Sequence, residues 1–275
     1  MKMLVLGGKG MAGHVIVKYF KEKKEWDVAY TSRDRNDLDG LYLDVFMQSK
    51  LEELIDDLKP DVVINAIGLL NDNANRNKAA AFKINSLLPH QISKLTERYG
   101  GKLVHISTDC VFSGKKGDYT ETDMRDGTSI YAKSKAVGEV ISDRHLTIRT
   151  SIIGPELKED GIGLFKWFMD QSGEVKGYQK MLWNGVTTLE LAKAIDVLLQ
   201  EQIVGLYHLG ADKKISKHDL LITIQNVFQK NDVVIVPDDE VVLDRTIKNT
   251  RTDIHYHVPP YKEMLIELKN WLDHE

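Results

Sequence analysis

The segment "YAKSK" places a tyrosine and a lysine, Tyr131 and Lys135, four residues apart. If the segment is helical, both side chains lie on one face. A tyrosine hydroxyl has an ordinary pKa of about 10, and a cation one helical turn away is expected to lower it. The pair could then pass a proton to a carbonyl oxygen, as the reduction of a ketone requires. Such pairs are common by chance, so the meaning of this one depends on its context.

Hydroxyl and carboxyl groups precede this pair, directly after the apolar run "KLVHI". Residues 107–123, "STDCVFSGKKGDYTETD", have the composition of a turn, which alone accounts for them. With partners elsewhere in the chain, however, this strand end with Thr108 and Asp109 could be a catalytic edge. Cys110 has no basic partner apart from His105, which lies back within the strand, so we interpret it as a packing residue.

A glycine-rich segment near the N-terminus supplies the context. "GGKGMAG" spaces Gly7, Gly10 and Gly13 three residues apart, between a predicted strand and a predicted helix, with Met11 inside the turn. Glycine permits positive φ and a close approach of the backbone to a pyrophosphate, which the helix N-terminus favours. A plain tight turn is the alternative, but the position after the first strand predicts a dinucleotide site.

The end of the second predicted strand indicates which dinucleotide is bound. NAD-binding turns usually carry an acidic residue about 20 residues downstream. Here the strand "DVAYTS" ends in Ser32 and Arg33, which could hold a 2′-phosphate. This favours NADPH, with NADH as the other option. The alternative for Arg33 is a solvated loop arginine beside Asp34 and Arg35.

Short apolar runs alternate with helical patterns up to residue 150. The predicted strands are 3–7, 27–32, 41–45, 61–68, 102–108 and 145–151, and the predicted helices are 11–25, 49–59, 78–100 and 129–143. Pro89 predicts a kink or a break in the long helix. This alternation predicts an α/β fold, a doubly wound parallel sheet of the Rossmann type.

After residue 150 the alternation is less regular. Helices are predicted at 163–171, 187–202, 217–230 and 261–274, and strands at 205–210 and 233–237. We interpret residues 1–150 as a dinucleotide-binding domain and 151–275 as a smaller substrate lobe. Part of 183–210 is expected to return to the first domain, because no linker separates the halves.

Composition excludes several classes of protein. Hydrophobic content is 42%, charged content is 28% and the net charge is −4, so neither nucleic acid nor an anionic membrane is indicated as a partner. A single cysteine excludes an internal disulfide and favours a cytoplasmic setting. The apolar run at the N-terminus is too short for a signal peptide or a membrane span.

Taken together, these motifs resemble the extended short-chain dehydrogenase/reductase superfamily, and within it the dTDP-4-dehydrorhamnose reductase branch. The resemblance rests on "GGKGMAG", "VVINAIG", "KIN", "HISTDCVFSGKKGDYTETD", "YAKSKAVGE", "LTIRTSIIG" and "WNGVTTLELAKAI". It implies reduction of the 4-keto group of a nucleotide-linked 6-deoxy sugar with NAD(P)H. The product would be a sugar for surface polysaccharide.

The resemblance also implies roles for individual residues. Thr108 would hydrogen-bond the substrate carbonyl, Tyr131 would donate the proton, and Lys135 would tune Tyr131 and hold the nicotinamide ribose. The expected cofactor contacts are Gly7, Gly10, Met11, Gly13, Ser32, Arg33, Asp44, Val45, Ala66, Ile67, Asn85 and Lys135. The expected substrate contacts are Asp109, Val111, Ser151, Trp183 and Arg245.

Departures from the family pattern gather where the sugar would lie. Cys110 and Ile152 stand where the family usually has aromatic residues, and Val186 stands where it usually has proline. The chemistry therefore resembles that of the branch, while the substrate is either the dTDP-linked sugar or a UDP-linked acetamido analogue.

Besides a redox sensor that binds NADPH and a protein partner, for which the sequence gives no positive feature, two other functions remain open on this fold. One is a nucleotide-sugar 4-epimerase; dehydratases of the superfamily carry glutamate at the position of Cys110, which argues against dehydration. The other is a non-catalytic NADP-binding regulatory subunit, such as that of methionine adenosyltransferase. Intact Thr108, Tyr131 and Lys135 argue against it. A homodimer is consistent with either reading.

Some residues allow two interpretations. Trp183 could stack on the nucleotide base or close the core, and Arg245, Lys248 and Arg251 could bind a diphosphate or be solvated. His255 and His257 offer two metal ligands without a third, so we interpret them as a surface turn and predict no metal site.

Overall fold

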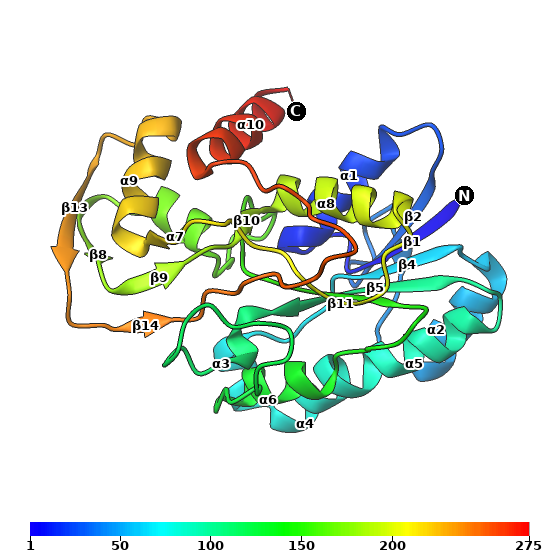
Figure 1. The fold of residues 1–275 in the computed structure, drawn as a ribbon. Coiled ribbons are helices and arrows are strands. Elements are labelled where there is room, and N and C mark those ends of the chain that lie inside the picture. Colours follow the sequence, from blue (N-terminus) through cyan, green and yellow to red (C-terminus); the bar gives the residue numbers. More distant parts are fainter. Residues whose placement is uncertain (275) are drawn as a thin grey trace.

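The computed structural model describes residues 1–274 and contains one seven-stranded, fully parallel sheet (Figure 1). Its strand order is β11-β6-β5-β4-β1-β2-β3. The strands are β1 (Lys2–Leu6), β2 (Asp27–Ser32), β3 (Leu41–Tyr42), β4 (Val62–Asn65), β5 (Lys102–Thr108), β6 (Leu146–Thr150) and β11 (Gly205–His208). The strand order reverses between β1 and β4, which confirms the predicted doubly wound fold and places a crevice at their carboxyl ends.

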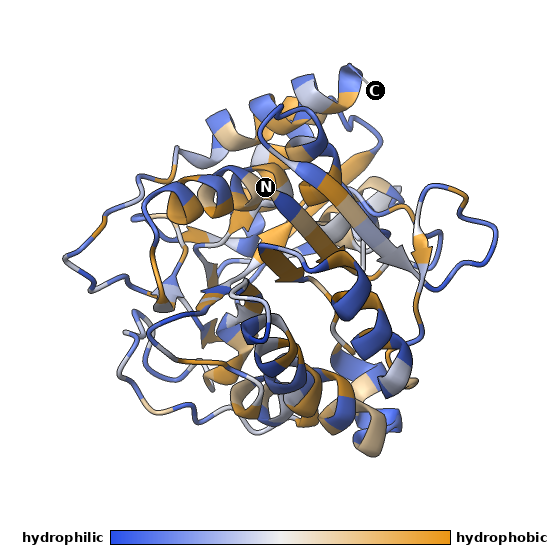
Figure 2. Ribbon diagram, turned by 90° about the vertical axis from the view of Figure 1, so that its right-hand side faces the viewer, coloured by the Kyte–Doolittle hydropathy of each residue, from blue (hydrophilic) through white to orange (hydrophobic). Residues whose placement is uncertain are grey.

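Helices cover both faces of this sheet (Figure 1). On one face lie α1 (Met11–Lys21), α8 (Thr188–Gln200) and α10 (Tyr261–Asp273), and on the other lie α2 (Gln48–Leu58), α5 (Leu88–Glu97) and α6 (Ile130–Val137). Figure 2 shows hydrophobic residues on the strands and on the helix sides turned toward them. The central strands are covered on both faces, which explains their nearly continuous apolar sequences.

The predicted long helix at 78–100 is divided into α4 (Lys78–Phe82), a π-helical turn (Lys83–Leu87) and α5. Pro89 has no N–H to donate to the Asn85 carbonyl, so the α-helical hydrogen-bond pattern cannot run through this point. The widened turn buries Asn85. The kink or break predicted from Pro89 is therefore confirmed.

Several predicted elements are shorter in the structure. The strand expected at 61–68 ends at Asn65, the helix expected at 129–143 ends at Val137, and the strand at 41–45 keeps only Leu41–Tyr42. Ala66 and Ile67 follow the end of β4, where they pack against the hydrophobic core and line a cavity. Apolar character alone does not show in a sequence where such a strand ends.

The small lobe contains short paired strands and two helices, α7 (Leu164–Met169) and α9 (Lys217–Phe228). Its strands are β7 (Ile152–Ile153) with β10 (Val186–Thr187), β8 (Gly173–Tyr178) with β13 (Val233–Asp238), and β9 (Met181–Trp183) between β12 (Ile215–Ser216) and β14 (Leu243–Asp244). Residues 188–208 provide α8 and β11 to the large sheet between two stretches of this lobe. The division at residue 150 stays a prediction.

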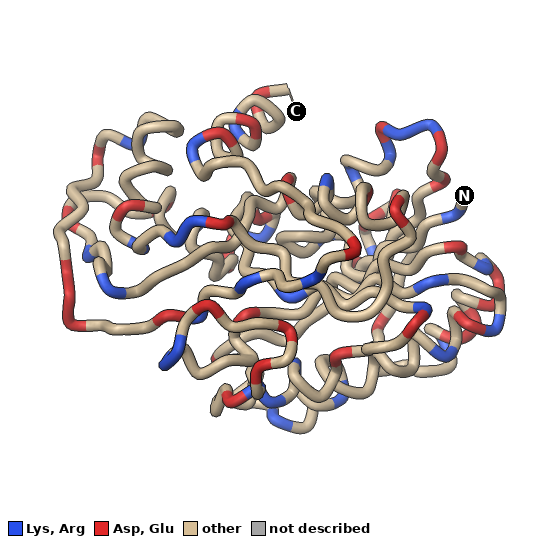
Figure 3. Tube along the Cα trace, in the orientation of Figure 1, with Lys and Arg blue, Asp and Glu red and all other residues tan. Residues whose placement is uncertain are grey.

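Charged residues of both signs are scattered along the trace (Figure 3). No helix within residues 1–274 is both long and apolar enough to cross a membrane.

Gly13 packs against the backbone of the glycine-rich turn. A Cβ atom at Gly13 would lie 2.1 Å from the Gly7 carbonyl oxygen. We therefore expect Gly13→Ala to lower the free energy of unfolding by about 1–3 kcal/mol, the usual cost of overpacking. Urea unfolding measures the change. Gly68→Ala is the control, because its added carbon meets nothing closer than 3.7 Å; equal loss in both variants would contradict the packing argument.

Candidate active site

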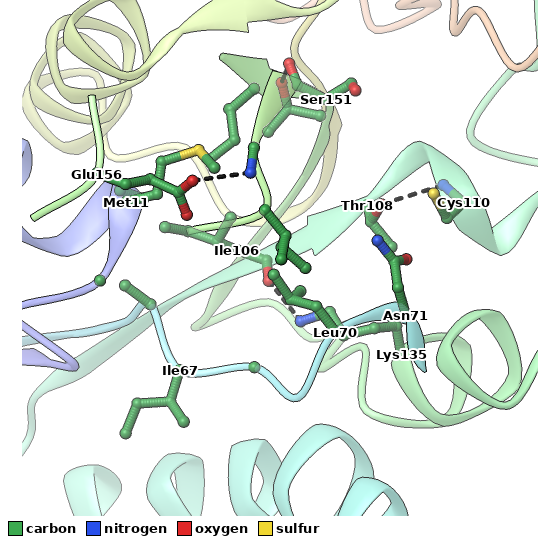
Figure 4. A pocket seen from close by; sticks show the side chains of 18 of the residues that line it. Met11, Ile67, Leu70, Asn71, Ile106, Thr108, Cys110, Lys135, Ser151 and Glu156 are labelled. Atoms are coloured by element: carbon green, nitrogen blue, oxygen red, sulfur yellow. Dashed lines mark hydrogen bonds between the residues drawn. The ribbon is translucent and has the colours of Figure 1, made fainter. Parts of the chain in front are cut away.

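A cavity of about 370 Å³ opens at the carboxyl ends of β1, β4, β5 and β6 (Figure 4). Nine of the residues predicted from the sequence line it: Gly10, Met11, Ala66, Ile67, Thr108, Asp109, Tyr131, Lys135 and Ser151. They come from segments far apart in the sequence, and the sheet brings them together. The predicted cofactor turn and the predicted proton-delivery residues thus share one space.

Thr108 is the last residue of β5, where the chain turns into a short 3-10 helix. Its hydroxyl donates to Asp109 Oδ1 at 3.1 Å and accepts a hydrogen bond from the backbone N–H of Cys110 at 3.1 Å. These bonds fix the hydroxyl at the cavity wall. The turn composition noted in the sequence therefore has a local cause, the capping of this short helix.

Tyr131 lies in the first turn of α6, whose N-terminus is capped by Ser129. The Ser129 hydroxyl accepts from the Ala132 N–H at 3.0 Å. Burial raises the pKa of Tyr131, the nearby Cys110 and Asp109 raise it further, and the neighbouring Thr108 hydroxyl opposes the shift. The lowered pKa expected from the Tyr131–Lys135 spacing is therefore wrong for this structure.

Lys135 explains this outcome, because its ammonium group is directed into the sheet. Nζ donates to the Ile106 carbonyl oxygen at 2.7 Å (Figure 4) and lies 3.3 Å from His105 Nε2. Burial lowers the pKa of Lys135 to about 8, against the opposing charge of Glu139. Burial and the charge of Lys135 also hold the pKa of His105 well below its usual value, so this imidazole is neutral.

Asn85 does not line the cavity but holds two of its walls together. Its Oδ1 accepts from the Leu69 N–H at 2.8 Å, and its Nδ2 donates to the Leu69 carbonyl at 2.9 Å and the Ser134 hydroxyl at 3.0 Å. The loop after β4 is thereby tied to α6. This places Asn85 as a positioning residue.

The predicted cofactor residues divide into two groups. Gly7 has φ +85°, and Gly10 precedes α1 with its N–H bonded to the Gly7 carbonyl at 2.9 Å. The backbone turn at the N-terminus of α1 therefore faces the cavity, as an anion site requires. The remaining predicted residues that do not line the cavity are Gly7, Gly13, Ser32, Arg33, Asp44 and Val45.

Gly7 and Gly13 belong to the glycine-rich turn and the start of α1, whereas Ser32, Arg33, Asp44 and Val45 lie at the end of β2 and after β3. Ser32 is buried and its hydroxyl accepts from the Asp34 N–H at 3.0 Å, while Arg33 is exposed. Asp44 Oδ1 accepts from the Phe46 N–H at 3.0 Å. Asp37, which the sequence reading did not consider, is buried between the Tyr30 hydroxyl at 2.9 Å and Lys9 at 3.6 Å.

The predicted substrate residues are also divided. Ser151 lines the cavity, whereas Val111 is fully buried in a cluster with Phe112, Tyr119 and Ile247. Trp183 is buried in the small-lobe core and donates to the Ser151 hydroxyl at 2.8 Å. Of the two interpretations of Trp183, the structure supports closure of the core.

The three basic residues considered for a diphosphate have different environments. Arg245 Nη1 contacts Cys110 Sγ at 3.6 Å. Arg251 donates hydrogen bonds to Asp253 and to the carbonyl oxygens of Val204 and Leu206. Lys248 is exposed. Only Arg245 thus touches a residue of the cavity wall.

Some cavity residues were missed by sequence reasoning. They are Lys9, Leu70, Asn71, Ser107, Glu156, Leu157, Lys158 and Ile162. Glu156 Oε2 accepts from the Gly163 N–H at 2.7 Å (Figure 4), which closes the loop between β7 and α7 on itself at the cavity wall. This segment carries no motif, so only the fold shows that it reaches the glycine-rich turn.

A group of three potential metal ligands lies on the surface. Asp212, His255 and His257 are exposed, and their ligand atoms lie within 4.8 Å of one another. The sequence offered no third ligand for the histidines, and the structure supplies Asp212. None of the three lines the cavity.

The family model described as the RmlD substrate binding domain matches residues 1–251. The chain belongs to the RmlD family. A protein of Aggregatibacter actinomycetemcomitans named dTDP-4-dehydrorhamnose reductase is 26% identical over 238 residues, 81% of this chain and 78% of the relative. This confirms the resemblance drawn from the sequence motifs.

Two further comparisons extend the RmlD family assignment. The crystal structure of a dTDP-4-dehydrorhamnose reductase from Clostridium acetobutylicum superposes with a TM-score of 0.80 at 25% identity, covering 99% of this chain and 100% of that one. The methionine adenosyltransferase 2 subunit beta of Danio rerio is 24% identical over 254 residues, 87% of this chain and 77% of the relative. RmlD-like sequences thus include proteins named as reductases and proteins named as subunits.

Proposed function

We propose that the protein reduces the 4-keto group of a nucleotide-linked 6-deoxy sugar with NADPH. The observation that carries this proposal is the single cavity in which Thr108, Tyr131 and Lys135 meet the glycine-rich turn. The relatives named as dTDP-4-dehydrorhamnose reductases support the reaction class. The substrate is the dTDP-linked 4-keto sugar or a UDP-linked acetamido analogue.

The residues present fit a dinucleotide. Gly10, which has no side chain, lines the cavity at the N-terminus of α1. A side chain at Gly13 would collide with the Gly7 carbonyl oxygen. When bound, NADPH supplies the hydride. Gly10 and Met11 would hold its pyrophosphate, Ala66 and Ile67 its nucleotide, and Lys135 its nicotinamide ribose.

Residues of the chain itself would then transfer the proton. Tyr131 carries its proton at neutral pH, since a tyrosine pKa is ordinarily about 10 and burial raises it further. It would donate this proton to the oxygen of the forming alkoxide. Thr108 would hydrogen-bond the same oxygen and fix the ketone in place. Asp109 would contact the sugar beside them.

The test of this function is NADPH oxidation with a panel of 4-keto-6-deoxy nucleotide sugars, both dTDP-linked and UDP-linked. We expect turnover with at least one of them. No turnover with any member would contradict the proposal and favour the regulatory-subunit alternative. Transfer of label from reduced cofactor into product separates net reduction from epimerisation, which would retain NAD through the cycle.

Cofactor choice can be tested at Arg33, which is exposed at the end of β2. We expect Arg33→Ala to raise the Kd for NADPH about tenfold and to leave that for NADH nearly unchanged, because only NADPH carries a 2′-phosphate. Fluorescence titration measures both. Arg76→Ala, an exposed arginine on α3 (Asn71–Arg76), is the control. Equal weakening of the two cofactors would remove Arg33 from this role.

Lys135 gives the binding of NADPH an expected pH dependence. Because its pKa is about 8, the ammonium is present below that pH and is lost above it. We expect the Kd for NADPH to rise as the pH increases through about 8, as measured by titration between about pH 6.5 and 9.5. Lys135→Met should bind weakly and without this dependence. The pKa of Lys217 is also about 8, so Lys217→Met must keep the step if Lys135 causes it.

The same proposal includes a cell compartment and a biosynthetic role. We place the reaction in the cytoplasm, as the single cysteine suggests, and in the synthesis of sugars for surface polysaccharide. A homodimer stays a prediction, which analytical ultracentrifugation would test.

A further inference from the structure

Two segments that connect the large sheet with the small lobe meet on the surface. Residues 209–214 lead from β11 in the large sheet to β12 in the small lobe, and residues 245–260 lead from β14 in the small lobe to α10 (Figure 1). The first segment carries Asp212, and the second carries His255 and His257. Their carboxylate oxygen and imidazole nitrogens lie within 4.8 Å of one another. Three groups of metal-binding type thus come together from two parts of the chain.

Tyr256 fixes the direction of the two histidines that flank it. Burial alternates along residues 254–258, so that both histidines are exposed while the residues before, between and after them pack on the core. The Tyr256 N–H donates to the Tyr207 hydroxyl at 3.2 Å, and the Tyr256 hydroxyl donates to Glu190 Oε1 at 2.6 Å. Because Tyr256 is held through both its backbone and its side chain, the two imidazoles are held on the outer side of this segment.

The backbone on both sides of Asp212 is also held in place. Before it, the Ala211 N–H donates to the Asn184 carbonyl oxygen at 2.7 Å, and Asn184 Nδ2 donates to the Ala211 carbonyl oxygen at 2.9 Å. After it, the Lys213 carbonyl oxygen accepts a hydrogen bond from the Tyr261 hydroxyl. The Asp212 side chain itself is exposed. This carboxylate therefore needs only a rotation of its side chain to reach an ion between the histidines.

The three side chains are not engaged by other protein groups. Within residues 1–274, none of them forms a hydrogen bond or an ion pair with another residue. His218, by comparison, already pairs with Asp219 at 3.0 Å. The ligand atoms of the cluster are therefore available to an ion without the loss of an existing contact.

We propose that Asp212, His255 and His257 bind a divalent transition-metal ion, with Zn²⁺ as the best match to these ligands. Two imidazoles and one carboxylate suit Zn²⁺, whereas Mg²⁺ and Ca²⁺ take mainly oxygen ligands. Bonds of about 2.0–2.2 Å place the ligand atoms of a tetrahedral zinc roughly 3.3 Å apart, so each exposed side chain moves by roughly 1 Å. Water completes the coordination.

The ion would act as a clip between the two segments. Asp212 and the histidines lie on either side of residues 215–244, a small-lobe stretch that contains β12, α9, β13 and β14. Closing so long a loop through one ion favours the folded chain, and an ion that binds only the folded chain raises the midpoint of unfolding. None of the three ligands lines the active-site cavity, so the proposal does not rest on the proposed reaction.

The experiment is isothermal titration calorimetry of Zn²⁺ into the full chain, prepared without an added histidine tag and freed of metal with a chelator. The variants are Asp212→Asn, His255→Gln and His257→Gln. His274→Gln is the matched control, because His274 is an exposed histidine outside the cluster. Mg²⁺ is the control ion. Thermal unfolding without metal establishes that each variant folds; if one does not, the other two decide.

We expect one Zn²⁺ per chain in the wild type and in His274→Gln, and an affinity lower by about tenfold or more in each of the three cluster variants. Zn²⁺ at about a hundredfold excess over Kd should raise the Tm of the wild type by about 5–10 °C, and a chelator should reverse the rise. The cluster variants should show much smaller shifts at the same concentration. Mg²⁺ should neither bind measurably nor raise Tm.

Three results would overturn the proposal. The first is the absence of saturable Zn²⁺ binding to the wild type. The second is a Kd within about twofold of the wild type in at least two of the cluster variants, which would place the ion elsewhere on the chain. The third is binding of Mg²⁺ as tight as that of Zn²⁺, which would exclude a site selective for transition metals. These measurements need no turnover, so failure of this site and failure of the proposed function are distinguishable.

Discussion

Replacing Tyr131 with phenylalanine is expected to lower kcat by about 10²–10⁴-fold while leaving the Kd for NADPH nearly unchanged. The change removes one hydroxyl from the cavity and keeps the ring. Without that hydroxyl, Thr108 would remain to hold the ketone oxygen, but no positioned group would deliver the proton. Steady-state kinetics on the accepted sugar, together with a fluorescence titration of NADPH, measure the two quantities.

The control for this variant is Tyr99→Phe, which removes the hydroxyl of an exposed tyrosine that bonds Asp56 at 3.0 Å, outside the cavity. It should keep full activity. Retained turnover in Tyr131→Phe would contradict the assigned proton donor. A parallel loss of NADPH binding would show instead that the hydroxyl supports the cofactor site.

The strand–helix alternation was predictable because the central strands are buried on both faces. Residues 62–65 and 102–108 were predicted as strands for that reason. The apolar periodicity of α8, α9 and α10 predicted the bounds of these helices to within two residues. The strands β8, β9, β12 and β14 were not found. β9, β12 and β14 are short, and the longer β8 alternates exposed with buried residues and contains two glycines. All four pair with distant segments, so no local pattern marks them.

The site was predictable where a motif fixes both residue type and spacing. Thr108, Tyr131, Lys135 and the glycine-rich turn belong to such motifs, and the structure brings Thr108, Tyr131 and Lys135 to one cavity with Gly10. The direction in which Lys135 points was not predictable. Its ammonium bonds Ile106 and faces His105, which depends on how α6 packs on β5.

Side-chain contacts in the small lobe were even harder to predict from the sequence than the direction of Lys135. Lys217 was not singled out in the sequence, because a lysine at the start of a helix has no distinguishing pattern. Its cation–π contact with Trp183 and its proximity to Asp109 arise from the pairing of β12 with β9. Spacing within one element can be read from a sequence, whereas contacts between lobes need the register.

Arg149→Met is expected to give the largest loss of stability. Arg149 and Glu139 are buried beneath the active site and form two parallel hydrogen bonds, Nε to Oε1 and Nη2 to Oε2, each 2.7 Å long. Burial alone would raise the pKa of Glu139, but hydrogen bonds and charge from Arg149 outweigh it and lower the pKa. Removing one partner of such a buried pair costs about 3–5 kcal/mol. The corresponding fall in Tm is roughly 6–20 °C.

The pH dependence separates lost charge pairing from lost packing. Because the folded pKa of Glu139 is lowered, its stabilising contribution is present above the unfolded pKa of about 4.3 and is lost as the pH falls through the folded value. In Arg149→Met the carboxylate is left with Ser107 and Arg125, so the deficit in unfolding free energy should shrink toward acid pH. Urea unfolding at about pH 7 and about pH 3 measures the deficit on either side of this window. Arg98→Met, which breaks an exposed pair with Glu52, should change little at either pH. A deficit in Arg149→Met that stays constant with pH would assign the loss to packing.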